Sequence, residues 1–243
     1  MLSARALATD SPYMLKPFDT VLVCAAHPDD EVLGCGGTIA KDAAAGSAVH
    51  ILILGQGLYS RGDVGDSDAL EKLREAARRS AAILGARSIT FGDLPDNRMD
   101  EVGRLDVVKI IEDAIDRLRP DAVYSHHFGD MNIDHVRVNE CVSVACRPQP
   151  SHGVKELRFF EVPSSTEWRP TTERPFMPNI FVDIDAFLAQ KLAALREYDQ
   201  EMRPWPHPRS YQAVEHLARW RGASAGVAAA EAFVLGRRIE GGK

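Results

Sequence analysis

A chain of 243 residues with 45% hydrophobic and 26% charged residues has the composition of a globular protein, long enough to bury a core. Its formal net charge of −6 argues against nucleic acid as the main partner, because phosphate neutralisation needs a basic surface. No apolar run approaches the ~20 residues that cross a bilayer, and the first residues lack the apolar stretch of a signal peptide. We therefore expect a cytoplasmic protein without a membrane span.

Short apolar runs of strand length alternate with helical patterns along the first two thirds of the chain. In chain order the runs and periodicities predict a strand at 20–27, a helix from Glu31, a strand at 47–55, a helix at 69–85, a strand at 88–94, a helix at 104–120, a strand at 121–127 and a helix through Val136. Such alternation is typical of parallel βαβ units. The sequence thus predicts an α/β fold with a Rossmann-like, mostly parallel sheet flanked by helices.

The last third of the chain is less regular. Strands are expected at 156–163 and 178–185 and helices at 186–202 and 211–222, whereas 230–239 reads equally as strand or helix. Between the two helices, "RPWPHPRS" at 203–210 must be irregular, because three prolines in five residues exclude both helix and central strand. No linker separates this part, so we expect a single domain over 1–243, with a core at 18–147 and a C-terminal region at 148–243 that completes the pocket.

The stretch "AHPDDE" at 26–31 places one imidazole and three acids directly after the first predicted strand. Ligands of open α/β sheets bind at the carboxyl ends of the strands, where this motif lies. The simple alternative is a polar loop in which Asp30 caps the following helix. A divalent metal would relieve the mutual repulsion of His27, Asp29 and Asp30 and their neighbours, which favours a metal site.

Three glycines follow this motif, at positions 34, 36 and 37. A dinucleotide-binding G-x-G-x-x-G pattern would need glycine at position 39, where the chain has isoleucine. No acid stands about 20 residues further on to hold a ribose. The glycines therefore do not indicate a nucleotide site.

A second polar cluster, "SHHFGDMNIDHVRVNE" at 125–140, follows the fourth predicted strand and enters a helix. It brings His135 to the same edge of the sheet as His27 and Asp30. Two nitrogens and one carboxylate, with a position left for water, are typical of catalytic rather than structural zinc. His126 and His127 are either part of this site or loop histidines without a role.

The motif at 26–31, together with "DH" at 134–135 after the fourth strand, resembles the PIG-L/LmbE-like de-N-acetylase family, over at least residues 20–140. Members of this family are zinc-dependent enzymes that remove acetyl groups from N-acetylated amino sugars. The resemblance implies that Zn²⁺ is the cofactor, with another divalent metal such as Fe²⁺ as the alternative. It also implies that Asp29 is the general base and that the metal ligands are His27, Asp30 and His135.

The chain departs from the family in its second motif, where H-x-x-H is usual and Asn132 replaces the first histidine. Asparagine can donate a hydrogen bond to an oxyanion but has no titratable proton for the leaving amine. The acid must then be Asp29 itself or one of three histidines, His126, His127 and His207, among which we favour His127. Asp134 is expected to orient a neighbouring histidine, or to cap its helix.

Further polar residues are candidates for contacts with a sugar or a phosphate: Arg61, Asn97 and Arg98 after strand ends, and His207 and Arg209 in the loop at 203–210, beside Asn132. The loop at 203–210 either walls the pocket or forms a contact between copies of the chain in a homo-oligomer. The expected partner is a small N-acetylated sugar, either free or carried on a nucleotide, and not nucleic acid. Two alternatives stay open, namely hydrolysis of another amide, such as a sugar–thiol conjugate, and a non-catalytic relative that binds metal or sugar.

Overall fold

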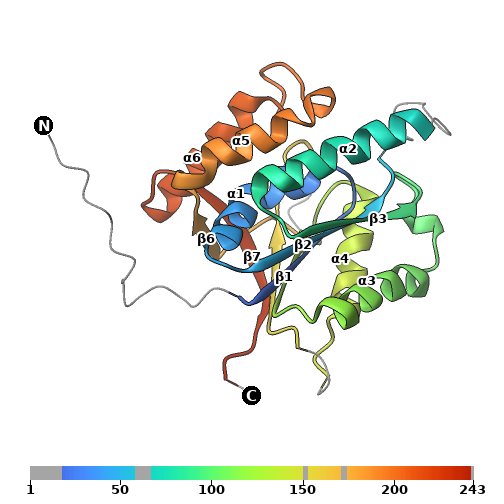
Figure 1. The fold of residues 1–243 in the computed structure, drawn as a ribbon. Coiled ribbons are helices and arrows are strands. Elements are labelled where there is room, and N and C mark those ends of the chain that lie inside the picture. The colour runs from blue at the N-terminus through green and yellow to red at the C-terminus, as the bar shows by residue number, and fades with distance from the viewer. Residues whose placement is uncertain (1–17, 58–66, 150–152, 171–173, 242–243) are drawn as a thin grey trace, which may run out of the picture.

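A seven-stranded sheet with the order β3-β2-β1-β4-β5-β7-β6 forms the centre of the computed structural model (Figure 1). The structure describes residues 18–57, 67–149, 153–170 and 174–241. The strands are β1 (Thr20–Ala25), β2 (Ala48–Gly55), β3 (Ser88–Leu94), β4 (Ala122–His126), β5 (Glu156–Phe160), β6 (Ile180–Asp183) and β7 (Ala230–Arg238). β1 to β5 pair in parallel, whereas β7 runs antiparallel to both of its neighbours. The predicted mostly parallel α/β fold is confirmed.

Helices cover both faces of this sheet. One face carries α1 (Asp30–Ala44), α2 (Ser67–Leu84), α5 (Leu188–Arg196) and α6 (Tyr211–Ala225), and the other carries α3 (Arg104–Leu118) and α4 (Ile133–Ala145) (Figure 1). Two separate apolar clusters fill the spaces between sheet and helices. The strands β1, β2 and β4 are almost entirely buried, and their sequences are mostly apolar, as a central parallel strand requires. Within the described part of the chain, no helix combines the length and apolar character that a membrane crossing needs.

The C-terminal third differs in detail from what its sequence pattern suggests. The sequence of 230–239 fitted strand and helix equally well. In the structure this stretch forms β7, which lies between β5 and β6. The helix expected over 186–202 ends at Arg196 and is followed by the short 3₁₀ turn Asp199–Glu201. Between them, Tyr198 is buried and its hydroxyl donates to Glu31 Oε1 at 2.6 Å. This inward contact turns the chain away from a continuous helix.

The glycines after the first motif serve packing. A Cβ at Gly34 would overlap the ring of Phe160 on β5, and one at Gly37 would lie 2.6 Å from Cδ1 of Ile184. The absence of side chains at these positions lets α1 lie against the C-terminal third. A nucleotide loop is not needed to explain the glycines, in agreement with the spacing argument.

Helix α1 is interrupted at Cys35, whose φ of −147° is not helical. The break frees the amides of Gly37 and Thr38, which donate to the Glu231 carboxylate of β7 at 2.9 and 2.7 Å. Lys191 of α5 donates to the same carboxylate at 2.6 Å. A buried acid from the C-terminal third therefore acts as the cap of the second half of α1.

Candidate metal centre and active site

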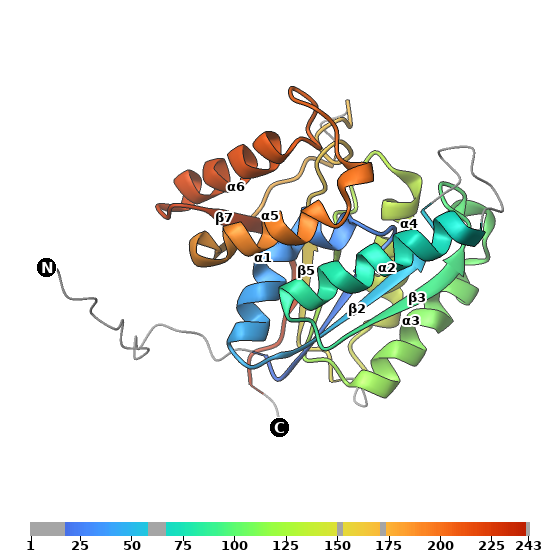
Figure 2. The same cartoon turned by 45° about the horizontal axis from the view of Figure 1, so that its top comes forward.

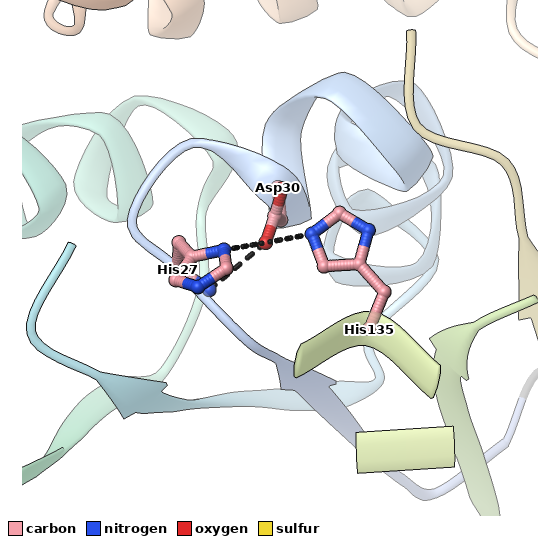
Figure 3. Close-up of side chains that lie close together, drawn as sticks. All are labelled: His27, Asp30 and His135. Atoms are coloured by element: carbon pink, nitrogen blue, oxygen red, sulfur yellow. Dashed lines mark hydrogen bonds and ion pairs between the residues drawn. The ribbon is translucent and has the colours of Figure 1, made fainter. Parts of the chain in front are cut away.

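The two motifs meet because β1 and β4 are adjacent parallel strands, so that their carboxyl ends lie at one edge of the sheet. His27 follows β1, Asp30 begins α1, and His135 lies in the first turn of α4. Figure 3 shows the three side chains pointing toward one another. Asp30 Oδ2 lies 3.3 Å from His27 Nδ1 and 3.2 Å from His135 Nε2.

This cluster has the properties of a site for a divalent cation. Its three ligand atoms all lie within 4.8 Å of one another, and all three residues are buried. Asp30 Oδ1 and His135 Nε2 are buried without a hydrogen-bond partner among the described residues. Buried polar atoms are rarely left without a partner. Two imidazole nitrogens and a carboxylate oxygen match the usual ligands of catalytic zinc, so the residues fit the metal.

Electrostatics at the cluster favour positive charge. Burial lowers the pKa of His27, but hydrogen bonds to surrounding carboxylates outweigh burial and hold this pKa well above its usual value. Burial likewise lowers the pKa of His135, yet the charges of Asp30 and Asp130 raise it to about 9. The surrounding carboxylates thus favour positive charge at the point where a cation fits.

Carboxylates hold the outer nitrogen of each histidine. His27 Nε2 lies 2.9 Å from Asp134 Oδ2 and 3.0 Å from Asp96 Oδ1. His135 Nδ1 lies 3.2 Å from Asp130 Oδ1. Such contacts fix the orientation of metal-binding imidazoles. Asp134 therefore has the neighbour that we expected for it, whereas the contacts of Asp96 and Asp130 with the two histidines were missed by sequence reasoning.

Asp130 links the second motif to the segment after β5. Its carboxylate accepts hydrogen bonds from the hydroxyl of Ser165 and, at 2.6 Å, from that of Thr166. Asn132 N also donates to Asp130 Oδ1 at 2.9 Å. The position of Asp130, five residues before His135, is the only signal that the sequence offers for this role.

Asp29 lies beside the cluster but pairs elsewhere. Its φ of 105° is rare for a residue with a side chain, and it occupies the position before the first turn of α1. Its Oδ2 accepts a hydrogen bond at 2.9 Å from Nη1 of Arg209, in the proline-rich loop before α6. Burial raises the pKa of Asp29 to about 6, although the charge of Arg209 acts to lower it.

Glu31, the third acid of the first motif, points away from the metal cluster toward the C-terminal third. Its Oε2 accepts from the Asp29 amide at 3.1 Å, and its Oε1 accepts from the Tyr198 hydroxyl. Burial raises the pKa of Glu31 to about 8, against a lowering by the Tyr198 hydrogen bond. Glu31 thus holds the backbone turn at Asp29.

The three histidines considered as acids have different surroundings. His126 Nε2 accepts a hydrogen bond from the Ala26 amide at 2.8 Å, and burial lowers the pKa of His126 to about 3. His127 Nε2 lies 3.1 Å from the Arg174 carbonyl oxygen, and burial lowers the pKa of His127. His207 Nδ1 accepts from the Arg209 amide at 3.0 Å. His126 and His127 are both fully buried.

Asn132 is the N-cap of α4, because its Oδ1 accepts from the Asp134 amide at 2.8 Å. Its Nδ2 lies 3.4 Å from Oδ1 of Asn97. The backbone amide of Asn97 in turn donates to Asp134 Oδ2 at 2.6 Å. The side-chain oxygen of Asn132 therefore stabilises the helix that carries His135.

The two arginines predicted from the strand ends to bind substrate have different outcomes. Arg98 is exposed and forms two hydrogen bonds with Glu101, at 3.0 and 2.6 Å, which hold it within its own turn. Arg61 lies outside the described residues. A role for either arginine in binding stays a prediction.

The family model for GlcNAc-PI de-N-acetylase (PIG-L) matches residues 22–146, a stretch that contains both motifs and more than half of the chain. The chain belongs to this family. The resemblance stated from the two motifs is therefore confirmed. This deacetylase family member holds, at the expected sheet edge, a buried His/Asp cluster that fits a divalent metal.

Individual relatives carry more than one activity in their names. The chain is 30% identical over 202 residues to 4-oxalmesaconate hydratase of Pseudomonas putida. The match covers 75% of this chain and 74% of the relative. The chain is 29% identical over 210 residues to diacetylchitobiose deacetylase of Thermococcus kodakarensis, covering 76% of this chain and 72% of the relative. Among solved structures, a conserved protein of Thermus thermophilus superposes with a TM-score of 0.73 at 28% identity, covering 93% of this chain and 97% of the other.

Proposed function

We propose that this protein is a zinc-dependent N-deacetylase that removes the acetyl group from an N-acetylated amino sugar. The observation that carries the proposal is the convergence of His27 Nδ1, His135 Nε2 and Asp30 Oδ2 at one point, with Asp29 beside them and outside the set. Three protein ligands and a neighbouring carboxylate form the arrangement that metal-dependent hydrolysis of an amide requires. Fe²⁺ is an alternative metal for the same ligands.

In this proposal His27, Asp30 and His135 hold the cation. When bound, the ion would act as a Lewis acid that polarises the acetyl carbonyl and lowers the pKa of a water molecule. Asp134 and Asp96 keep the outer nitrogen of His27 in place, and Asp130 does the same for His135. These carboxylates fix which ring nitrogen faces the cation.

Asp29 accepts the proton of the attacking water as the new C–O bond forms at the acetyl carbon. The C–N bond then breaks, and the departing nitrogen takes a proton, so that the products are acetate and a free amino sugar. Asp29 can return the proton that it accepted, which was one of the alternatives left by the sequence. The surroundings of His126 and His127 support this alternative, because each is buried and uses Nε2 in a hydrogen bond to the backbone.

His127 stays the histidine to test against Asp29. Its Nδ1 is buried without a hydrogen-bond partner among the described residues, so a proton on that atom has no competing acceptor there. His127→Gln preserves a side-chain donor for the Arg174 carbonyl but not the titratable ring. Turnover of this variant near the wild-type rate supports proton return by Asp29, whereas a loss of about 10²-fold or more assigns the acid to His127.

The hydratase relative supports a second candidate, the addition of water to an unsaturated carboxylic acid. Its 30% identity to the chain is close to that of the deacetylase relative. The same metal cluster and base would activate water for either reaction. A direct comparison of substrates is therefore the decisive experiment.

Purified protein loaded with Zn²⁺ is incubated with a panel of N-acetylated sugars, and the released acetate is measured. The panel contains free N-acetylated sugars, diacetylchitobiose and N-acetylated sugars linked to a nucleotide. A parallel arm measures hydration of 4-oxalmesaconate. We expect acetate from at least one sugar and none after chelation of the metal. Hydration without acetate release supports the second candidate, and no product in either arm indicates a binding protein or a hydrolase of another amide.

A further inference from the structure

We propose that Arg209 is a positioning residue that keeps the Asp29 carboxylate out of the metal's ligand set and available as the base. This inference deepens the proposed function and rests on it for the role of Asp29. The loop that carries Arg209 belongs to the C-terminal third, 180 residues away from Asp29 in sequence. Figure 2 shows the loop before α6 beside the segment that follows β5.

The guanidinium joins these two segments over the base. Arg209 Nη1 donates to Asp29 Oδ2 at 2.9 Å, and Arg209 Nε donates to the Ser164 hydroxyl at 2.8 Å. Asp29 is 1% exposed and the Arg209 side chain 23% exposed, so water screens this ion pair only in part. A shielded, charge-assisted hydrogen bond of this kind restricts the carboxylate to one orientation.

Arg209 is itself held from both sides of its backbone. Its amide donates to Nδ1 of His207 at 3.0 Å, and its carbonyl accepts from the Arg203 amide at 3.1 Å. The next residue, Ser210, is the N-cap of α6, and its hydroxyl oxygen accepts from the Ala213 amide at 3.1 Å. The loop therefore presents the guanidinium at a fixed place, without the regular hydrogen bonding of a helix or strand.

Asp29 needs such a partner because of what lies next to it. Its carboxylate has no hydrogen-bond partner besides Arg209 among the described residues. Asp30, His27 and His135 are close enough to act on its charge. A divalent cation at the cluster would attract a second free carboxylate as a ligand, and a liganded Asp29 could not accept a proton from water. The bond to Arg209 opposes that movement.

The test is a double-mutant cycle in the full-length protein, with acetate release as one measurement. Arg209→Ala is expected to lower kcat about 10²-fold with little change in KM, because a displaced reacting group costs about that much. Added guanidinium should restore part of the loss. Combined with Asp29→Asn, the Arg209→Ala change should have almost no further effect, because Arg209 acts through Asp29.

Arg203→Ala is the matched control, since Arg203 lies in the same loop and its side chain donates only to the carbonyls of Gln200 and Met202 among the described residues. We expect this variant to keep wild-type kcat. A kcat within threefold of wild type in Arg209→Ala overturns the proposal. The proposal is also overturned if the fold-losses in kcat of the two single variants multiply in the double variant, because Arg209 then does not act through Asp29.

A second measurement needs no turnover and separates this inference from the proposed function. Cobalt(II) is bound in place of zinc, and its visible absorption reports the coordination. In Arg209→Ala the released Asp29 should join the ion, so the spectrum should change and affinity for Co²⁺ should rise several-fold. Both effects should vanish in the Arg209→Ala, Asp29→Asn double variant. Unchanged spectra in every variant count against the inference, even where acetate release confirms the deacetylase.

Discussion

The candidate active site joins two regions that are built in different ways. The metal cluster belongs to the parallel half of the sheet, where His27 and His135 follow adjacent strands and reach the same edge. The partner of the base comes from the C-terminal third, where Arg209 lies in an irregular proline-rich loop. In the first region the sheet topology places the side chains, and in the second a set of individual contacts does so.

This difference separates two tasks within one site. The parallel half supplies the ligands together with the carboxylates that orient them, Asp96, Asp134 and Asp130. The C-terminal third supplies contacts to the turn that carries the base, through Arg209 to its side chain and through Tyr198 and Glu31 to its backbone. Changes at the ligands and at the carboxylates that orient them should therefore remove metal, whereas changes at the base or at its contacts with the C-terminal third should leave metal and remove turnover.

The largest effect is expected from His135→Ala. Removing one of three ligands should abolish stable binding of the metal and, with it, measurable turnover. Elemental analysis of the purified protein and the acetate assay check both. His216→Ala is the control, because that histidine lies on α6 and contacts only the ring of Trp205 among described aromatic residues. Metal retained undiminished in His135→Ala would exclude it as a ligand.

Asp29→Asn should lower turnover by about 10²–10⁴-fold while one equivalent of metal remains bound. Asparagine keeps the shape of the side chain and can still accept a hydrogen bond from Arg209, but it cannot take a proton from water. Metal content and kcat, measured on the same preparation, give the result. Loss of metal together with activity would instead make Asp29 a ligand.

The contact between the two regions can be disturbed at α1. In Gly34→Ala the new methyl group would overlap the Phe160 ring, and overpacking of this kind costs roughly 1–3 kcal/mol of unfolding free energy. Gly36→Ala is the milder comparison, since the nearest atom to its new methyl group would be Val32 Cγ1 at 3.0 Å, in place of the overlap with an aromatic ring. Thermal or denaturant unfolding measures the difference. Equal stability of the two variants would show that Phe160 moves aside without cost.

The smallest effect is expected at the cap of α4. Asn132→Ala removes the acceptor for the Asp134 amide and should lower the unfolding free energy by about 1 kcal/mol. Asn132→Ser keeps a capping oxygen and should recover most of that loss. If Asn132 also donates to the substrate oxyanion, both variants lose turnover beyond their change in stability. If wild type and Asn132→Ser have equal turnover, Asn132 acts only as the N-cap of α4.

Much of the fold could be predicted from the sequence because the parallel strands are buried on both faces. Continuous apolar runs such as 20–25 and 48–55 separated by amphipathic helices leave few arrangements other than a doubly wound sheet. The same pattern indicated where the first two polar clusters would meet. The strand β7 was undecided, because its stretch fits both strand and helix until β5 and β6 offer edges with which to pair.

The sequence by itself determined the family and the edge of the sheet at which His27, Asp30 and His135 come together. Local periodicity and chain order suffice for this, since the carboxyl ends of neighbouring parallel strands must lie side by side. Only the tertiary structure decided that Arg209 pairs with Asp29, that Asn132 caps α4 and that Glu31 bonds with Tyr198. The Arg209 and Tyr198 contacts join residues far apart in sequence, through irregular segments without periodicity, so they become visible only when the chain has folded.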